Sequence, residues 1–199
     1  VGISLEMHAP VPGIERTPHS ILSLGRIAPS KNIHVLIEAL GILKTEHVEC
    51  TASIYGSTLP ENKAYEARLR SRVAEIGLGE RVSFYPGVPN EQSPNVYSAH
   101  EIFVNISPQG MFDKTMLEAA ACECIVVTAN KDAAEYLDPS LIVQPSVEPH
   151  DIAQKLSLAL TIEGERKDAI LSHEHALVSY HSRTHLIERL AEEMKCTPQ

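Results

Sequence analysis

The sequence has 199 residues, of which 43% are hydrophobic, 22% are charged and 5% are aromatic. This composition is typical of a globular protein, and the length allows one large domain but not two complete nucleotide-binding domains. The formal net charge of −9 argues against a nucleic acid or an anionic membrane as the main partner, because both need a basic surface. An anionic small molecule remains compatible with this charge if local basic side chains hold it.

The four cysteines are too sparse to form a disulfide framework. Cys122 and Cys124 are closer together than paired zinc ligands, and no second pair accompanies them, so no metal site is predicted. We interpret both as small apolar residues at a junction between a helix and a strand. The sequence shows no signal peptide and no membrane-spanning apolar run, so we expect a cytoplasmic protein.

Residues 1–19 contain three prolines and no sustained period, which predicts a linker that leads into a domain covering residues 20–199. Short apolar segments then alternate with amphipathic ones. The predicted strands are residues 20–27, 50–55, 81–85, 101–106, 125–129 and 141–144. The predicted helices are residues 31–46, 62–78, 92–99, 114–122, a short one near 133–137, and most of the chain from Asp151 onward, with breaks near Gly164 and residues 181–182.

This alternation predicts an α/β fold in which a six-stranded parallel, doubly wound sheet of the Rossmann-like type carries helices on both faces. Ligands of such sheets bind beyond the carboxyl ends of the strands, where the strand order reverses. The residues that follow the predicted strands are therefore candidates for ligand binding. They are Gly25, Arg26, Lys31, Gly56, Ser57, Pro86, Gly87, Val88, residues 107–114 and residues 128–131.

Arg26 and Lys31 follow the first predicted strand and stand beside the start of a helix. Arginine can bind phosphate oxygens through two nitrogens and lysine adds a point charge, so the pair suits a diphosphate. The alternative is that both are solvated loop residues, as most charged loop residues are.

A second group of candidates surrounds the start of the helix predicted at residues 114–122. Asp113 is a suitable N-cap, and amides of the first helical turn could hold a phosphate. Glu118 lies about one turn further on, where a carboxylate could accept hydrogen bonds from two ribose hydroxyls. The alternative is a Lys114–Glu118 ion pair on a wet helix face, although apolar neighbours predict that Glu118 is buried and needs a partner.

These segments resemble the group 1 (family 4) glycosyltransferases. LSLGRIAPSKNIHVLIEAL is similar to their phosphate-binding stretch, and FVNISPQGMFDKTMLEAAACECIVV is similar to their E-x7-E region. RVSFYPGVPNEQSPNVYSAHEIFV resembles the segment before that region, and VGISLEMHAP resembles the interdomain linker. Three motifs in the family's order are more specific than any one of them. The resemblance covers nearly the whole chain and implies the C-terminal half of a GT-B fold.

The resemblance implies a retaining transferase that moves a sugar from a nucleoside diphosphate, UDP being the expected type, without a metal or other cofactor. Arg26 and Lys31 match the catalytic pair that neutralises the donor diphosphate, and Glu118 matches the residue that binds the ribose. Gly87 and Val88 match the base-binding backbone, while backbone amides of Thr115 and Met116 would bind phosphate. The implied donor-binding set is Gly25, Arg26, Lys31, Gly56, Gly87, Val88, Gly110, Asp113, Lys114, Thr115, Met116 and Glu118.

The implied partner is a further Rossmann-like domain, N-terminal in the same enzyme and not contained in this sequence. That domain would hold the acceptor, a glycan or a lipid, and could bring the enzyme to a membrane surface. Without it, we expect the isolated chain to bind a donor and to transfer no sugar.

The sequence departs from the family at several positions. Gly110 stands where the family has its first glutamate, so Asp113 or Lys114 could contact the donor sugar instead. Glu123 and Ile125 stand where glycine and proline are common, and a left-handed conformation at Glu123 would be strained.

These departures leave open a non-catalytic module that binds nucleotides without transfer. A phosphorylase-like or epimerase-like relative of the same fold also remains open. A generic dinucleotide-binding domain fits poorly, because no G-x-G-x-x-G follows the first strand.

Overall fold

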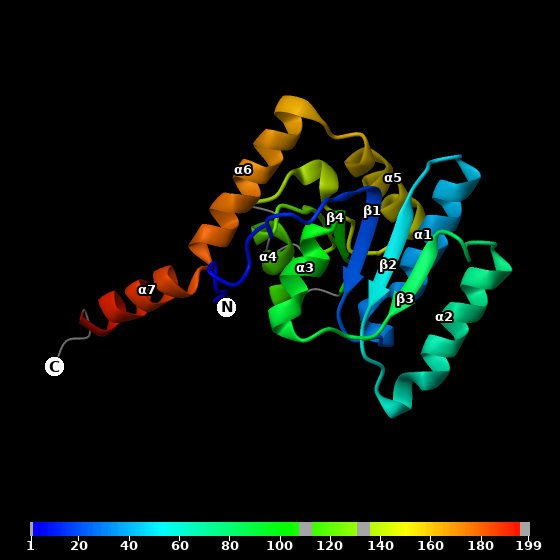
Figure 1. The fold of residues 1–199 in the computed structure, drawn as a ribbon, viewed down its shortest axis with the longest axis horizontal. Coiled ribbons are helices and arrows are strands. Elements are labelled where there is room, and N and C mark those ends of the chain that lie inside the picture. Colours follow the sequence, from blue (N-terminus) through cyan, green and yellow to red (C-terminus); the bar gives the residue numbers. More distant parts are fainter. Residues whose placement is uncertain (1, 108–112, 131–135, 196–199) are drawn as a thin grey trace.

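The computed structural model describes residues 2–107, 113–130 and 136–195. Within these residues, one parallel sheet has the strand order β3-β2-β1-β4-β5 (Figure 1). The strands are β1 (Thr17–Leu24), β2 (Thr51–Tyr55), β3 (Val82–Tyr85), β4 (His100–Asn105) and β5 (Ile125–Thr128). The helices are α1 (Ile33–Thr45), α2 (Lys63–Glu75), α3 (Ser93–Ser98), α4 (Lys114–Ala121), α5 (Pro149–Leu160), α6 (Gly164–Tyr180) and α7 (Arg183–Lys195).

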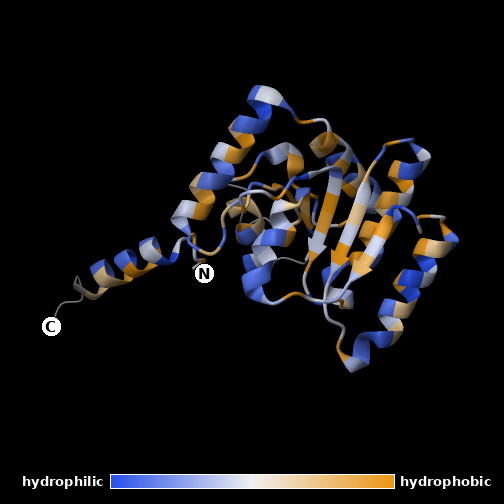
Figure 2. Ribbon diagram, viewed as in Figure 1, coloured by the Kyte–Doolittle hydropathy of each residue, from blue (hydrophilic) through white to orange (hydrophobic). Residues whose placement is uncertain are grey.

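Helices cover both faces of the sheet, which confirms the predicted α/β class. In β1, Ile21 packs into a core with α1, α2 and α5, whereas the adjacent Leu22 packs into a second core with α3, α4 and α6. Successive strand residues point to opposite faces, so a strand buried on both faces is apolar at consecutive positions. Figure 2 shows this as largely hydrophobic strands flanked by helices of mixed character.

The prediction of a sixth strand at residues 141–144 is wrong. Leu141 instead ends a short 3-10 turn (Pro139–Leu141), which Asp138 caps by accepting from the amide of Ser140 at 2.8 Å. Pairing with β5 is limited to one bridge between Ile142 and Thr128. Two residues later, the amide of Gln144 donates to Asp151 at the start of α5 (2.6 Å) rather than to a strand. The helix predicted near residues 133–137 falls mostly outside the described residues.

The helix predicted from residue 31 begins two residues later. Lys31 ends a 3-10 turn (Pro29–Lys31), and Asn32 adopts a left-handed conformation with φ 53° before α1 starts. The side-chain amide of Asn32 donates to the carbonyl of Ile106 at 3.0 Å. This contact ties the turn to the end of β4 and places Lys31 at the edge where ligands of such sheets bind.

The N-terminal stretch packs along the domain. Ile3 is buried and bridges to Ser182 between α6 and α7, where the helix break was predicted. Further along, Arg16 donates to the carbonyls of Cys122 and Glu123 at the end of α4. From Thr17 the chain is strand, three residues earlier than predicted.

The turn from α4 to β5 contains Glu123 between two cysteines. Glu123 has φ 61°, the left-handed conformation that is strained for this residue type, and its carbonyl and that of Cys122 accept hydrogen bonds from Arg16. Cys122 and Cys124 are buried and free on either side, and burial raises the pKa of the Cys122 thiol to about 12. Both are therefore inert packing residues, as interpreted from the sequence.

The C-terminal helix α7 extends away from the sheet (Figure 1). Its exposed residues include the apolar side chains of Ile187, Leu190 and Met194. No helix in the described parts of the chain combines the length and apolar character needed to cross a membrane.

Candidate functional site

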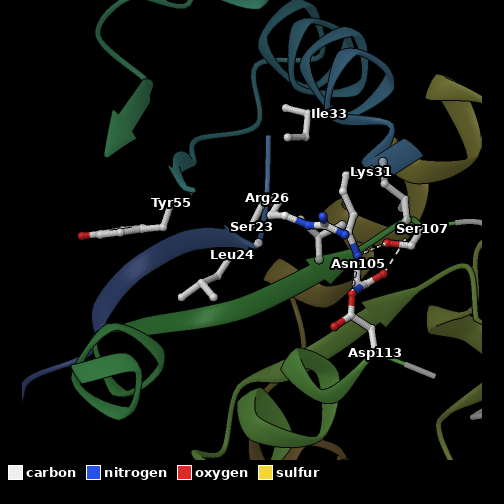
Figure 3. Close-up of a pocket in the computed structure, with 12 residues that line it drawn as sticks. Ser23, Leu24, Arg26, Lys31, Ile33, Tyr55, Asn105, Ser107 and Asp113 are labelled. Atoms are coloured by element: carbon white, nitrogen blue, oxygen red, sulfur yellow. Dashed lines mark hydrogen bonds and ion pairs between the residues drawn. The ribbon is translucent and has the colours of Figure 1, made fainter. Parts of the chain in front are cut away.

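A cleft opens at the carboxyl ends of β1 and β4 (Figure 3). The chain passes from β1 to β2 on one side of the sheet, while β4 lies on the other side, so this is the point where strand order reverses. The residues lining the cleft are Ser23, Leu24, Gly25, Arg26, Lys31, Ile33, Tyr55, Val104, Asn105, Ile106, Ser107 and Asp113. The structure therefore brings together Arg26 and Lys31, from the connection between β1 and α1, and Asp113, from the start of α4.

Arg26 is the unpaired cation of the cleft. Its side chain is exposed, and no ion pair or hydrogen bond from its guanidinium is found among the described residues. Figure 3 shows the side chain extending over the cleft toward Asn105 and Lys31. A guanidinium in this position is available to bind an anion through two nitrogens.

Lys31 is held by polar groups from β4 and α4. Its ammonium lies 2.6 Å from Oδ2 of Asp113 and 3.1 Å from Oγ of Ser107. Asn105 donates to the same Asp113 oxygen at 3.0 Å. Burial raises the pKa of Asp113, but hydrogen bonds from Lys31, Thr115 and Asn105 outweigh it and hold the pKa below its ordinary value. The carboxylate is therefore ionised and balances the charge of Lys31.

The cleft is nearly filled by its own side chains. The free volume at its centre is about 20 Å³, roughly enough for one or two water molecules.

Close backbone approach at the neighbouring strand ends requires glycine. A side chain at Gly56 would collide with the carbonyl oxygen of Gly25, and one at Gly87 would collide with Ser57. Gly56 and Gly87 line an adjacent hollow beyond β2 and β3, next to the cleft that contains Gly25. Val88 follows Gly87 and lines neither space.

Glu118 is buried on α4 and lines neither of these two spaces. Its Oε2 accepts a hydrogen bond from the hydroxyl of Tyr97 at 3.1 Å, which supplies the partner that the sequence called for. The alternative ion pair with Lys114 is wrong, because Lys114 is exposed and no such pair exists between these two described residues.

The first turn of α4 is capped by Asp113, as predicted. The amide of Thr115 donates to Asp113 Oδ1 at 3.3 Å, and the amide of Met116 donates to the Asp113 carbonyl at 3.2 Å. Both amides proposed for phosphate are thus engaged in the cap in this structure, while Lys114 is exposed beside them. Gly110 lies outside the described residues.

Asn105 and Tyr55 line the cleft but are not among the candidates from the sequence, because both fall within the predicted strands 101–106 and 50–55. Asn105 also accepts from the amide of Ser107 at 3.1 Å and so shapes the turn that leaves β4. The sequence does contain a sign that Asn105 belongs to the site: it is a polar residue near the carboxyl end of an apolar strand, and that end lies at the edge of the sheet where ligands bind.

Comparison with known proteins agrees with this geometry. The family of glycosyl transferases group 1 matches residues 6–173. Mannosylfructose-phosphate synthase of Agrobacterium fabrum is 31% identical over 104 residues, which are 51% of this chain and 23% of that enzyme. The chain spans between 23% and 42% of the length of the curated relatives it matches.

Two solved structures share the fold. HepE of Anabaena, in complex with UDP and glucose, superposes with a TM-score of 0.82 at 20% identity over 98% of this chain and 56% of HepE. The C-terminal domain of the group 1 glycosyl transferase LpcC from Francisella tularensis has a TM-score of 0.76 at 22% identity, covering 89% of this chain and 97% of that domain.

Fold and cleft together define a Rossmann-like α/β domain with two cations at its switch point. The family match covers most of the chain, and this protein belongs to the glycosyl transferases group 1.

Proposed function

We propose that this chain is the donor-binding domain of a retaining glycosyltransferase and binds a nucleoside-diphosphate sugar. The observation that carries the proposal is the pair of cations, Arg26 and Lys31, in one cleft at the switch point of the sheet. The protein has a net charge of −9, so an anion must be attracted by such local groups. During transfer, both cations would stabilise the negative charge that develops on the leaving diphosphate.

The other donor-binding residues have proposed roles along the same edge of the sheet. The base would bind to the backbone of Gly87 and Val88, and the ribose hydroxyls to Glu118. The diphosphate would lie over Gly25 and Gly56, and freed amides at Thr115 and Met116 would approach it from α4. Asp113 and Lys114 at the start of α4 are the candidates for the donor sugar. The proposal includes no metal ion, because Arg26 and Lys31 supply the positive charge.

UDP is the nucleotide we propose first. HepE, whose fold this chain shares, has been solved with UDP and with UDP-glucose. The acceptor, a glycan or lipid, would be held by an N-terminal Rossmann-like domain of the same enzyme, and we propose that transfer requires it.

A second candidate is a module that binds nucleotides without transferring sugar. Gly110 favours it, since this position carries no side chain where relatives have a glutamate. The two candidates predict the same nucleotide binding and differ only in transfer when the acceptor-binding domain is supplied.

The test is a thermal-shift screen of the chain against UDP, GDP and ADP. A ligand at 100 times its dissociation constant adds about 2.7 kcal/mol to stability, which shifts the melting temperature by several degrees. The relative from Francisella tularensis yielded a structure of its C-terminal domain alone, so a chain of this extent is suited to such work. Stabilisation by one diphosphate supports the proposal, and no shift with any of them contradicts it.

A further inference from the structure

His8 lies buried between the N-terminal stretch, α3 and α4. Its Nε2 is 3.4 Å from Oγ of Ser93 and 3.7 Å from Oε1 of Glu118, and its Nδ1 is 3.3 Å from the carbonyl of Ser4. The Ser93 hydroxyl donates to the carbonyl of Asn90 at 2.8 Å, which leaves its oxygen as an acceptor. In the tautomer that carries its proton on Nε2, the ring donates towards Ser93 and faces Glu118, whose Oε1 at 3.7 Å is a close polar neighbour beyond hydrogen-bond distance.

The carboxylate of Glu118 consequently has a polar neighbour beside each oxygen. Tyr97, which is fully buried on α3, donates to Oε2, and His8 approaches Oε1. An ionised carboxylate has about four lone-pair sites, so these two contacts leave lone pairs that can accept hydrogen bonds from two hydroxyls. Holding the carboxylate in one rotamer reduces the entropy lost when a ligand binds to it.

The stretch that carries His8 is itself anchored to the domain. The amide of Ile3 donates to the carbonyl of His181 at 3.0 Å, and the amide of Arg183 donates to the carbonyl of Ile3 at 2.9 Å. These bonds fix the stretch at the junction of α6 and α7. His8 therefore joins the segment that leads into the domain to the carboxylate on α4.

We propose that His8 is a positioning residue for nucleoside binding, which acts by holding the Glu118 carboxylate in the orientation that accepts the ribose hydroxyls. This inference rests on the proposed function of Glu118. It makes the N-terminal stretch part of the ribose subsite, so a displacement of that stretch would weaken the donor's hydroxyl contacts while leaving its diphosphate contacts intact.

The experiment compares calorimetric affinities for UDP and for 2′,3′-dideoxy-UDP in wild type, His8→Ala and His8→Gln. We expect His8→Ala to weaken UDP binding about five- to tenfold, with dideoxy-UDP changed less than about twofold. His8→Gln should recover most of the loss, because its amide donates at similar reach. His100→Ala is the matched control, since His100 is buried, bonds to the carbonyl of Val96 and makes no contact with Glu118.

If His8→Ala does not fold, His8→Phe tests the same contact, because it keeps a buried ring and removes the nitrogen beside Glu118. It should show the same loss confined to UDP. Equal losses for both ligands, or no loss, in the folded His8 variant overturn the inference when Glu118→Gln still weakens UDP selectively. If wild type binds UDP and dideoxy-UDP with the same affinity, Glu118 does not bind the ribose hydroxyls. His8 then cannot act through Glu118, and the inference is overturned together with that proposed role.

Discussion

The ammonium of Lys31 lies 2.6 Å from a carboxylate oxygen of Asp113, so one of the two cations proposed for the diphosphate already has an anionic partner. Both side chains are about four-fifths buried. A diphosphate that binds Lys31 must therefore compete with Asp113, whereas Arg26 has no ion-pair partner among the described residues. The two cations of the cleft therefore differ before any ligand binds: Lys31 is paired with Asp113, and Arg26 is exposed. Substituting one or the other should have different effects.

Arg26→Ala should weaken UDP binding about tenfold or more with little change in thermal stability, because its side chain is exposed and pairs with no residue in the described parts of the chain. Lys31→Ala should weaken UDP binding at least as much and should also lower stability, because it leaves Asp113 without its cation. Calorimetry and thermal unfolding measure the two effects.

Uridine and Arg68→Ala serve as controls for these substitutions. Binding of uridine should be unchanged in either variant, since it has no phosphate. Arg68 is an exposed arginine on α2, outside the cleft, and its loss changes the net charge equally. If Arg68→Ala weakens UDP binding as much as Arg26→Ala does, the effect is one of overall charge and the cleft is not the diphosphate site.

Asp113→Asn should keep the fold, because asparagine caps a helix nearly as well as aspartate, and a lost cap costs only about 1 kcal/mol. The substitution removes the competitor for Lys31, so UDP should bind more tightly, by about threefold. For wild type we predict that UDP-glucose binds little better than UDP, because capping and pairing with Lys31 already occupy this side chain. A clear advantage for one nucleotide sugar that Asp113→Asn abolishes would make Asp113 the sugar contact instead.

Glu118→Gln should weaken binding of UDP about tenfold and leave binding of dideoxy-UDP unchanged, because an amide offers one acceptor oxygen where the carboxylate offers two. Tyr97 can still donate to that oxygen, so the fold should hold. A fall in melting temperature with unchanged affinities would show that Glu118 has a purely structural role.

Glu174 predicts a pH dependence of stability that is independent of ligand binding. It is buried on α6, and burial raises its pKa to about 8, although its Oε1 accepts from the amide of Val126 at 2.8 Å. The folded state keeps a proton that the unfolded state releases above pH 4.5. This contribution to stability is therefore complete below about pH 4.5 and is lost as the pH rises to about 8.

Glu174→Gln keeps the acceptor for Val126 and cannot titrate. The variant should gain stability relative to wild type as the pH rises from about 5 to about 8, by a few kcal/mol in total. Denaturant unfolding across this range measures the difference. A constant difference between the two proteins would show that Glu174 does not hold a proton in the folded state.

Local sequence patterns predicted most of the fold because buried parallel strands and amphipathic helices are encoded by neighbouring residues. Residues 141–144 show where this fails: three of the four are apolar, but Leu141 belongs to the 3-10 turn Pro139–Leu141, and pairing with β5 is limited to the bridge between Ile142 and Thr128. The side-chain cap of Asp138 that forms this turn has no periodic signal in the sequence.

The site was predicted as a set of residues but not as a set of contacts. Arg26, Lys31 and Asp113 could be assigned to one cleft because the carboxyl ends of parallel strands meet at one edge. That Lys31 pairs with Asp113, and that His8 reaches Glu118, depends on separations of 82 and 110 residues along the chain that no local pattern encodes. Tertiary contacts of this kind need the structure.

The central claim is that the cationic cleft binds a nucleoside diphosphate, and a calorimetric titration of the chain with UDP, repeated with Arg26→Ala, tests it most directly. The account predicts one saturable site for UDP, at least about tenfold weaker binding in Arg26→Ala, and unchanged binding of uridine. Wild-type and Arg26→Ala chains with the same affinity for UDP, or a chain that binds no nucleoside diphosphate, would contradict it.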